Sequence, residues 1–75
     1  METTAQEHLN WATDRALDYF DANDKMSAVT SFLSDVGKHP RTAWIQTHHL
    51  TMPMLMSQYD EGRDAFKKFM LGFSV

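Results

Sequence analysis

The fold is decided by residues 16–40, which read ALDYFDANDKMSAVTSFLSDVGKHP. Apolar residues recur at helical spacing on both sides of Asn23 and Asp24, which predicts the end of one helix, a turn and a second helix. Either Asn23 or Asp24 can leave the helical conformation and offer a side-chain oxygen as the N-cap of the second helix. Gly37 is expected to close that helix in the left-handed conformation, and Pro40 bars its continuation. The stretch therefore predicts an antiparallel helical hairpin.

The helix that enters this hairpin is expected to begin at Thr3 or Thr4 and to end near Asp21. Thr4 and Glu7 have the spacing of a capping box, in which the hydroxyl accepts a hydrogen bond from the N3 amide. Apolar and small residues then recur at helical spacing, while acidic and amide side chains gather on the opposite face. This pattern predicts an amphipathic helix with one buried stripe.

The second half of the chain contains an ambiguous segment, residues 42–57, which includes Pro53. One possibility is a single helix over 42–57 that is kinked at Pro53, because proline removes an amide donor and clashes with the carbonyl four residues earlier. The other is a short helix to His49 and a second helix from Thr51, with Pro53 in its first turn. We predict the kinked helix. A last helix is expected from Asp60 to Gly72.

These elements predict one all-α domain over residues 1–75, with four helices arranged as two antiparallel hairpins in a small, repeat-like bundle. A domain of this size has a thin core, so self-association is an expected source of further stability. The predicted core consists of Leu9, Ala12, Ala16, Tyr19, Phe20, Ala28, Val29, Phe32, Leu33, Val36, Ile45, Met52, Leu55, Met56, Phe66 and Phe69.

Composition narrows the function classes. The chain has no cysteine, so a disulfide framework is excluded. No apolar run approaches the roughly 20 residues that span a bilayer, and the N-terminus has no basic segment, which predicts an intracellular protein without a membrane anchor. The net charge of −3 is uneven, because residues 1–37 hold seven acids and two bases while residues 38–75 hold three acids and five bases. Such asymmetry is typical either of solvated helix faces, which is the favoured interpretation, or of a head-to-tail or antiparallel association between copies.

The first hairpin resembles a tetratricopeptide repeat. Ala16, Tyr19, Ala28, Phe32 and Pro40 fall at the spacings of that repeat, in which small residues let two helices approach closely and aromatic residues fill the groove between them. The sequence departs from the pattern at positions 12 and 15, where alanine and arginine stand in place of tryptophan and leucine. Because about three repeats are needed for a stable array, a genuine array would require other copies of the chain. Chance similarity within an all-helical sequence is the alternative.

A second resemblance covers nearly the whole chain. Residues 34–40, SDVGKHP, are followed by Thr42, a helix rich in methionine and leucine, and a short helix that ends with Phe69, Gly72 and Phe73. In this order the chain resembles a group of small proteins encoded by bacteriophages of actinobacteria. The resemblance implies a viral origin and a location in the host cytoplasm, but it supplies no activity and no site residues.

The strongest chemical candidates are His48, His49 and the methionines at positions 52, 54 and 56. Thioether and imidazole ligands suit copper(I). In a helix, however, Met54 points away from Met52 and Met56, so adaptable core packing is the favoured interpretation. The histidine pair has no placed carboxylate beside it, and the sequence contains no recognisable nucleophile turn. We therefore expect neither a catalytic activity nor a cofactor.

The sequence thus favours a protein–protein interaction module that associates with itself and with an unidentified host or phage protein. Its aromatic content exceeds what so small a core can hide, and the candidate anchors are Trp11, Trp44 and Phe73. The alternative is a small nucleic-acid-binding regulator that uses the basic residues of the last helix, Arg63, Lys67 and Lys68. A copper or other metal binder is the third and least favoured interpretation.

Overall fold

A computed structural model describes residues 4–75, and within this range it contains five helices and no strand. The helices are α1 (Ala5–Asp21), α2 (Lys25–Val36), α3 (Ala43–Thr47), α4 (Thr51–Glu61) and α5 (Arg63–Leu71). The all-helical prediction is confirmed, whereas the prediction of four helices is wrong. No helix in the described part of the chain is both long enough and apolar enough to cross a membrane.

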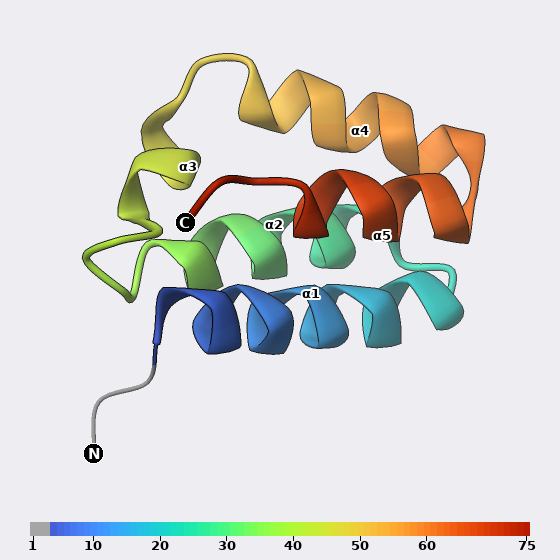
Figure 1. Cartoon of the computed structure of the whole chain (residues 1–75). Coiled ribbons are helices and arrows are strands. Elements are labelled where there is room, and N and C mark those ends of the chain that lie inside the picture. The colour runs from blue at the N-terminus through green and yellow to red at the C-terminus, as the bar shows by residue number, and fades with distance from the viewer. Residues whose placement is uncertain (1–3) are drawn as a thin grey trace.

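The helices form two packed layers (Figure 1). The long helices α1 and α2 run antiparallel to each other, and α4 and α5 also run antiparallel, with α5 lying against α1. The short α3 stands at one end of the molecule, where the C-terminus returns to lie near it. This arrangement brings the last residues of the chain against the connection between α2 and α4.

Local signals define the first two helices. Thr4 is the N-cap of α1, and its Oγ1 accepts a hydrogen bond from the Glu7 amide at 3.1 Å. Thr3, the other predicted start, lies outside the described residues. Between α1 and α2, Asn23 adopts a left-handed conformation with φ of 59°, and Asp24 caps α2 by accepting from the Ser27 amide. The predicted turn and its cap are therefore present.

Gly37 ends α2 for a different reason from the one predicted. Its φ is −69°, so the left-handed conformation expected there is wrong. Gln46 of α3 packs directly on this glycine: an added Cβ would lie 2.4 Å from Gln46 Nε2, and that amide donates to the Leu33 carbonyl at 3.0 Å. Glycine at position 37 therefore permits the close approach of α3 to the end of α2.

The predicted kinked helix over 42–57 is wrong. The chain leaves the helical conformation at His48, whose ψ is 124°, and a turn at His49 and Leu50 leads into α4. Pro53 is the third residue of α4, where the absent N–H would have had no partner within the helix. The proline therefore belongs to a helix start, as in the alternative interpretation, although Leu50 is the N-cap and the Thr51 side chain does not cap the helix.

The core lies between the two layers. Ten predicted core residues are fully buried, from Leu9 in α1 to Phe66 in α5, and four others are partly buried and pack against them. Tyr19 and Met52 are wrong predictions, because they are 37% and 45% exposed. Leu17 and Met70 are buried as well, although the predicted core given above does not include them. In α4, Thr51 and Leu55 are the residues that face inward. Met52 follows Thr51 directly in the helix and therefore lies outside the core.

Candidate functional site

An apolar pocket lies between the start of α4 and the C-terminal end of the chain. Its volume is about 170 Å³, and we call it the α3–α5 pocket because its lining begins at His48, directly after α3, and ends at Phe73, just after α5. Leu50 and Met54 come from the start of α4, and Phe69 and Phe73 come from α5 and the residues after it. The full lining consists of His48, Leu50, Thr51, Met54, Phe69 and Phe73.

Thr51 and His48 are the polar residues of this lining, and Thr51 is the buried one. It is only 2% exposed, and its Oγ1 is the one buried side-chain nitrogen or oxygen without a hydrogen-bond partner among residues 4–75. A buried hydroxyl normally has a partner, because leaving it unpaired carries the full cost of its desolvation. The other three buried polar residues satisfy this rule: Thr13, Asp35 and Thr42 all form hydrogen bonds. Thr51 also lines the pocket, so an unpaired hydroxyl is buried in a residue of the pocket wall.

The rim of the pocket exposes large apolar side chains. Leu50 is 52% exposed, Met54 is 41% exposed, and the neighbouring Trp44 of α3 is 44% exposed. The Trp44 ring meets Phe73 edge-on, with centroids 5.7 Å apart. Residues 42–59, which supply most of this surface, contain no Asp, Glu, Lys or Arg. An apolar surface free of such charges is typical of the centre of a protein–protein interface.

His48 holds one side of the pocket in place. Its Nδ1 accepts a hydrogen bond from the Leu50 amide at 3.2 Å, and its ring stacks on His49 with centroids 5.0 Å apart. Because Nδ1 accepts, this geometry requires an imidazole that is unprotonated at Nδ1. His48 thus orients the exposed Leu50 and also stands 6.4 Å, centroid to centroid, from the Trp44 ring.

The three predicted anchors do not share one surface. Phe73 lines the pocket and Trp44 contacts Phe73. Trp11 lies elsewhere, on α1 beside the contacts between α1 and α2. Trp11 is 40% exposed, but the Arg15 guanidinium lies 5.0 Å from its ring centroid and the Lys38 ammonium 5.8 Å. These cations already contact the indole. Trp11 therefore belongs to a polar cluster on the other hairpin.

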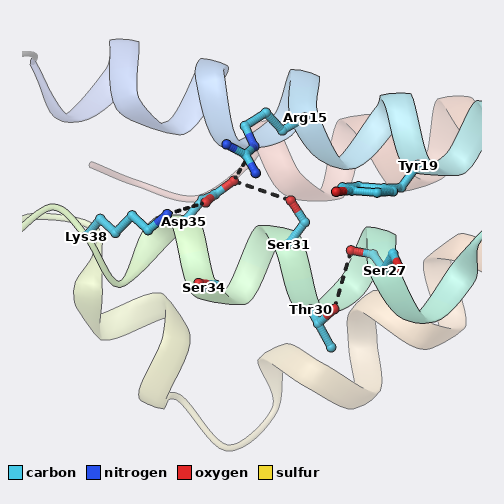
Figure 2. Close-up of a pocket in the computed structure, with 8 residues that line it drawn as sticks. All are labelled: Arg15, Tyr19, Ser27, Thr30, Ser31, Ser34, Asp35 and Lys38. Carbon is cyan, nitrogen blue, oxygen red and sulfur yellow. Dashed lines mark hydrogen bonds and ion pairs between the residues drawn. The ribbon is translucent and has the colours of Figure 1, made fainter.

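That cluster surrounds a buried carboxylate (Figure 2). The Asp35 side chain is 2% exposed, and it pairs with Arg15 Nε and with Lys38 Nζ, each at 3.1 Å. Ser31 Oγ donates to the same carboxylate at 3.3 Å, and His8 Nε2 contacts the Asp35 backbone carbonyl. The hydroxyl-lined groove beside it, of about 330 Å³, therefore has its charged groups already paired with one another. The ion pair between Arg15 and Asp35 holds α1 against α2.

The basic residues of the last helix are partly neutralised. Arg63 forms a two-pronged ion pair with Asp21 of α1, with Nε to Oδ1 at 2.9 Å and Nη2 to Oδ2 at 3.3 Å. The hydrogen bonds from this guanidinium to Asp21, and then the attraction between the two charges, raise the pKa of Arg63 above its ordinary value. Lys67 and Lys68 are exposed. Arg63 thus connects α1 to α5, which leaves two exposed lysines for a nucleic acid.

The candidate metal ligands are divided between the α3–α5 pocket and other positions on α4 or just before it. Among residues 4–75, no group of three or more His, Asp or Glu side chains is placed to hold a metal ion. Met54 and His48 line the α3–α5 pocket, whereas Met52 and Met56 are not part of its lining.

Comparison with known proteins adds no relative: no family model, curated protein or solved structure matches this chain. The interpretation of the site therefore rests on its geometry alone. Sequence reasoning identified Trp44 and Phe73 but missed Leu50, Thr51, Met54 and Phe69 as members of one surface. The signal that could have found three of them is the absence of Asp, Glu, Lys and Arg from residues 42–59.

Proposed function

We propose that this protein is a protein–protein interaction module that associates with itself through the α3–α5 pocket and its apolar rim. The observation that carries the proposal is the exposure of Trp44, Leu50 and Met54 around a pocket whose lining carries no formal charge. Burial of such side chains is the main favourable term in protein association. A rim of aromatic and methionine side chains is also typical of binding hot spots.

The proposal includes a role as a bacteriophage accessory protein in the host cytoplasm, for which the resemblance to small actinobacteriophage proteins is the support. In this role the same surface engages a host or phage protein. No catalytic step is proposed. The nucleic-acid alternative is less favoured, because Arg63 is engaged by Asp21 and its two neighbouring lysines share the helix with the acidic Asp64.

Sedimentation velocity tests self-association with a matched pair of variants in one helix. Met54 lines the pocket, whereas Met52 is exposed to a similar degree on α4 outside the pocket lining. A small interface predicts a weak dimer, so the wild type should gain mass as its concentration rises through roughly the micromolar to submillimolar range. Met54→Glu should remain monomeric, and Met52→Glu should behave like the wild type.

Circular dichroism of both variants checks that they fold, which surface substitutions permit. A wild-type chain that stays monomeric across this range contradicts the proposal. Equal effects of Met52→Glu and Met54→Glu would also contradict it, because the two side chains differ in their relation to the pocket and not in exposure.

A further inference from the structure

The α3–α5 pocket is open in the single chain, and the same surface presents an exposed indole beside it. We propose that Trp44 of a second copy fills this pocket and that its indole N–H donates a hydrogen bond to Thr51 Oγ1. Trp44 of the first copy makes the same contact in the pocket of the second copy. This inference rests on the proposed function and names the side chain that occupies the site. It makes the pocket incomplete in the monomer.

The size of the pocket fits one aromatic ring. Its volume is about 170 Å³. A dry apolar cavity of about 150 Å³ is large enough to bind benzene, whereas a single water takes up about 30 Å³. The lining from Leu50, Met54, Phe69 and Phe73 is apolar, so an inserted aromatic side chain gains more there than water does.

The unpaired hydroxyl of Thr51 selects the kind of ring. Its Oγ1 can accept a hydrogen bond, and an indole offers a donor and no acceptor. Tryptophan thus supplies both the apolar body for the pocket and the donor for its wall. Oγ1 is covered in the monomer, so the side chains that line the pocket, Met54 among them, have to shift as the indole enters. Methionine is suited to this movement because its chain is unbranched and flexible.

Trp44 is the tryptophan placed to make this contact. Its ring already stands beside two lining residues, Phe73 at 5.7 Å and His48 at 6.4 Å between centroids. In a two-fold dimer the same patch meets itself, so a side chain beside the pocket of one copy can reach the pocket of the other. Trp11, by contrast, is covered by two cations on the first hairpin.

The charge distribution also favours a second copy as the occupant. Each chain carries a net charge of −3, so two copies repel each other at most orientations. Residues 42–59 contain no Asp, Glu, Lys or Arg, so this surface lets two identical chains meet without placing formal like charges of those residues against each other. A charged partner would find no complementary carboxylate, ammonium or guanidinium in this segment.

Tryptophan fluorescence tests the occupant directly. Trp11→Phe leaves Trp44 as the only tryptophan. Its emission should shift to shorter wavelength, and its quenching by acrylamide should fall, as the concentration rises through the range in which sedimentation shows dimers. Adding Met54→Glu to Trp11→Phe gives the matched control, because this variant retains Trp44, should stay monomeric and should show neither change.

A double-mutant cycle tests the hydrogen bond. Trp44→Phe keeps a ring and removes the N–H, and Thr51→Val keeps the shape and removes the acceptor. Each single variant should weaken the dimer by roughly 25-fold, since a hydrogen bond contributes about fivefold and the dimer contains two. The dimer of the double variant should be at most about fivefold weaker than the dimer of either single variant.

The outcomes separate this inference from the proposed function. A dimer that depends on Met54 but leaves the Trp44 emission unchanged overturns the inference and leaves the proposed function standing. Fully additive losses in the cycle overturn the hydrogen bond between Trp44 and Thr51, and with it the inference. A wild-type chain that never dimerises overturns both proposals.

Discussion

Removing the two cations that pair with the buried carboxylate of Asp35 should destabilise the protein. The Asp35 side chain is 2% exposed, whereas Arg15 and Lys38 are 45% and 57% exposed. Arg15→Met together with Lys38→Met keeps most of the aliphatic chains that pack beside Trp11 and removes both charges. Asp35 then retains only the Ser31 hydroxyl as a side-chain hydrogen-bond donor among the contacts described above.

The expected loss of stability arises because Asp35 is buried, whereas its two cationic partners are about half exposed. Leaving a buried charge without its partner costs about 3–5 kcal/mol, and the Ser31 bond places this case near about 3 kcal/mol. For a domain of this size, that lowers the melting temperature by roughly 12–24 °C. Each single variant should lose less than half as much, because one cation remains at 3.1 Å in each. The total stability of such a domain is roughly 4–11 kcal/mol, so the double variant should still fold in the cold.

Thermal and guanidinium denaturation of a triple variant gives the decisive comparison. Adding Asp35→Asn to the double variant removes the unpaired charge and keeps the shape, so it should recover about 2 kcal/mol. A triple variant as unstable as the double variant would refute the reasoning, because lost packing and not the stranded charge would then explain the loss.

Three further predictions concern the fold. Hydrogen bonds from the Ser27 hydroxyl and amide lower the pKa of the exposed Asp24 below 3.8, so this cap stabilises the protein above about pH 4 and is lost as the pH falls through the lowered pKa. Asp24→Ala should therefore lower the melting temperature at pH 7, with a smaller difference from the wild type near pH 2. Gly62→Ala should cost about 1–3 kcal/mol in chemical denaturation from backbone strain alone, because φ is 126° and no atom lies within 4 Å of an added Cβ. Phe32→Ala should cost about 3–5 kcal/mol in the same assay, since this side chain is fully buried.

The sequence predicts the first hairpin well because its signals are local. The cap at Thr4 and the turn through Asn23 and Asp24 involve residues a few positions apart. The position of α3 against α2 is different, since it depends on contacts made with residues outside the segment 42–57. Thr42 Oγ1 donates to the Val36 carbonyl at 2.6 Å, and Gln46 reaches back to Leu33. Periodicity within residues 42–57 contains no trace of these bonds, so a kinked helix remained equally consistent with it.

The candidate site was only partly predictable for the same reason. Trp44 and Phe73 are visible as aromatic residues that a thin core does not need. The pocket that Phe73 lines arises only when the residues after α5 pack beside the start of α4, which no local pattern specifies. Tyr19 shows the converse error, because it has core spacing in α1 yet lines the polar groove above Ser31.

The unpaired hydroxyl of Thr51 leads to the prediction that separates function from stability. In the monomer this hydroxyl is buried without a partner, so Thr51→Val should raise the free energy of unfolding by about 1 kcal/mol. Both residues are β-branched, so helix propensity hardly changes. The same substitution should weaken self-association, and opposite effects of one substitution on stability and on binding are typical of a functional site.

The measurement needs the Met54→Glu background, in which dimer formation cannot add to the apparent stability of the monomer. Thr13→Val is the matched control, because Thr13 is equally buried but its Oγ1 donates to the Leu9 carbonyl at 2.8 Å. Guanidinium denaturation should show a gain for Thr51→Val and a loss for Thr13→Val. A loss at both positions would mean that the Thr51 hydroxyl has a partner within the monomer, and the pocket would then have no unmet hydrogen bond to offer a second chain.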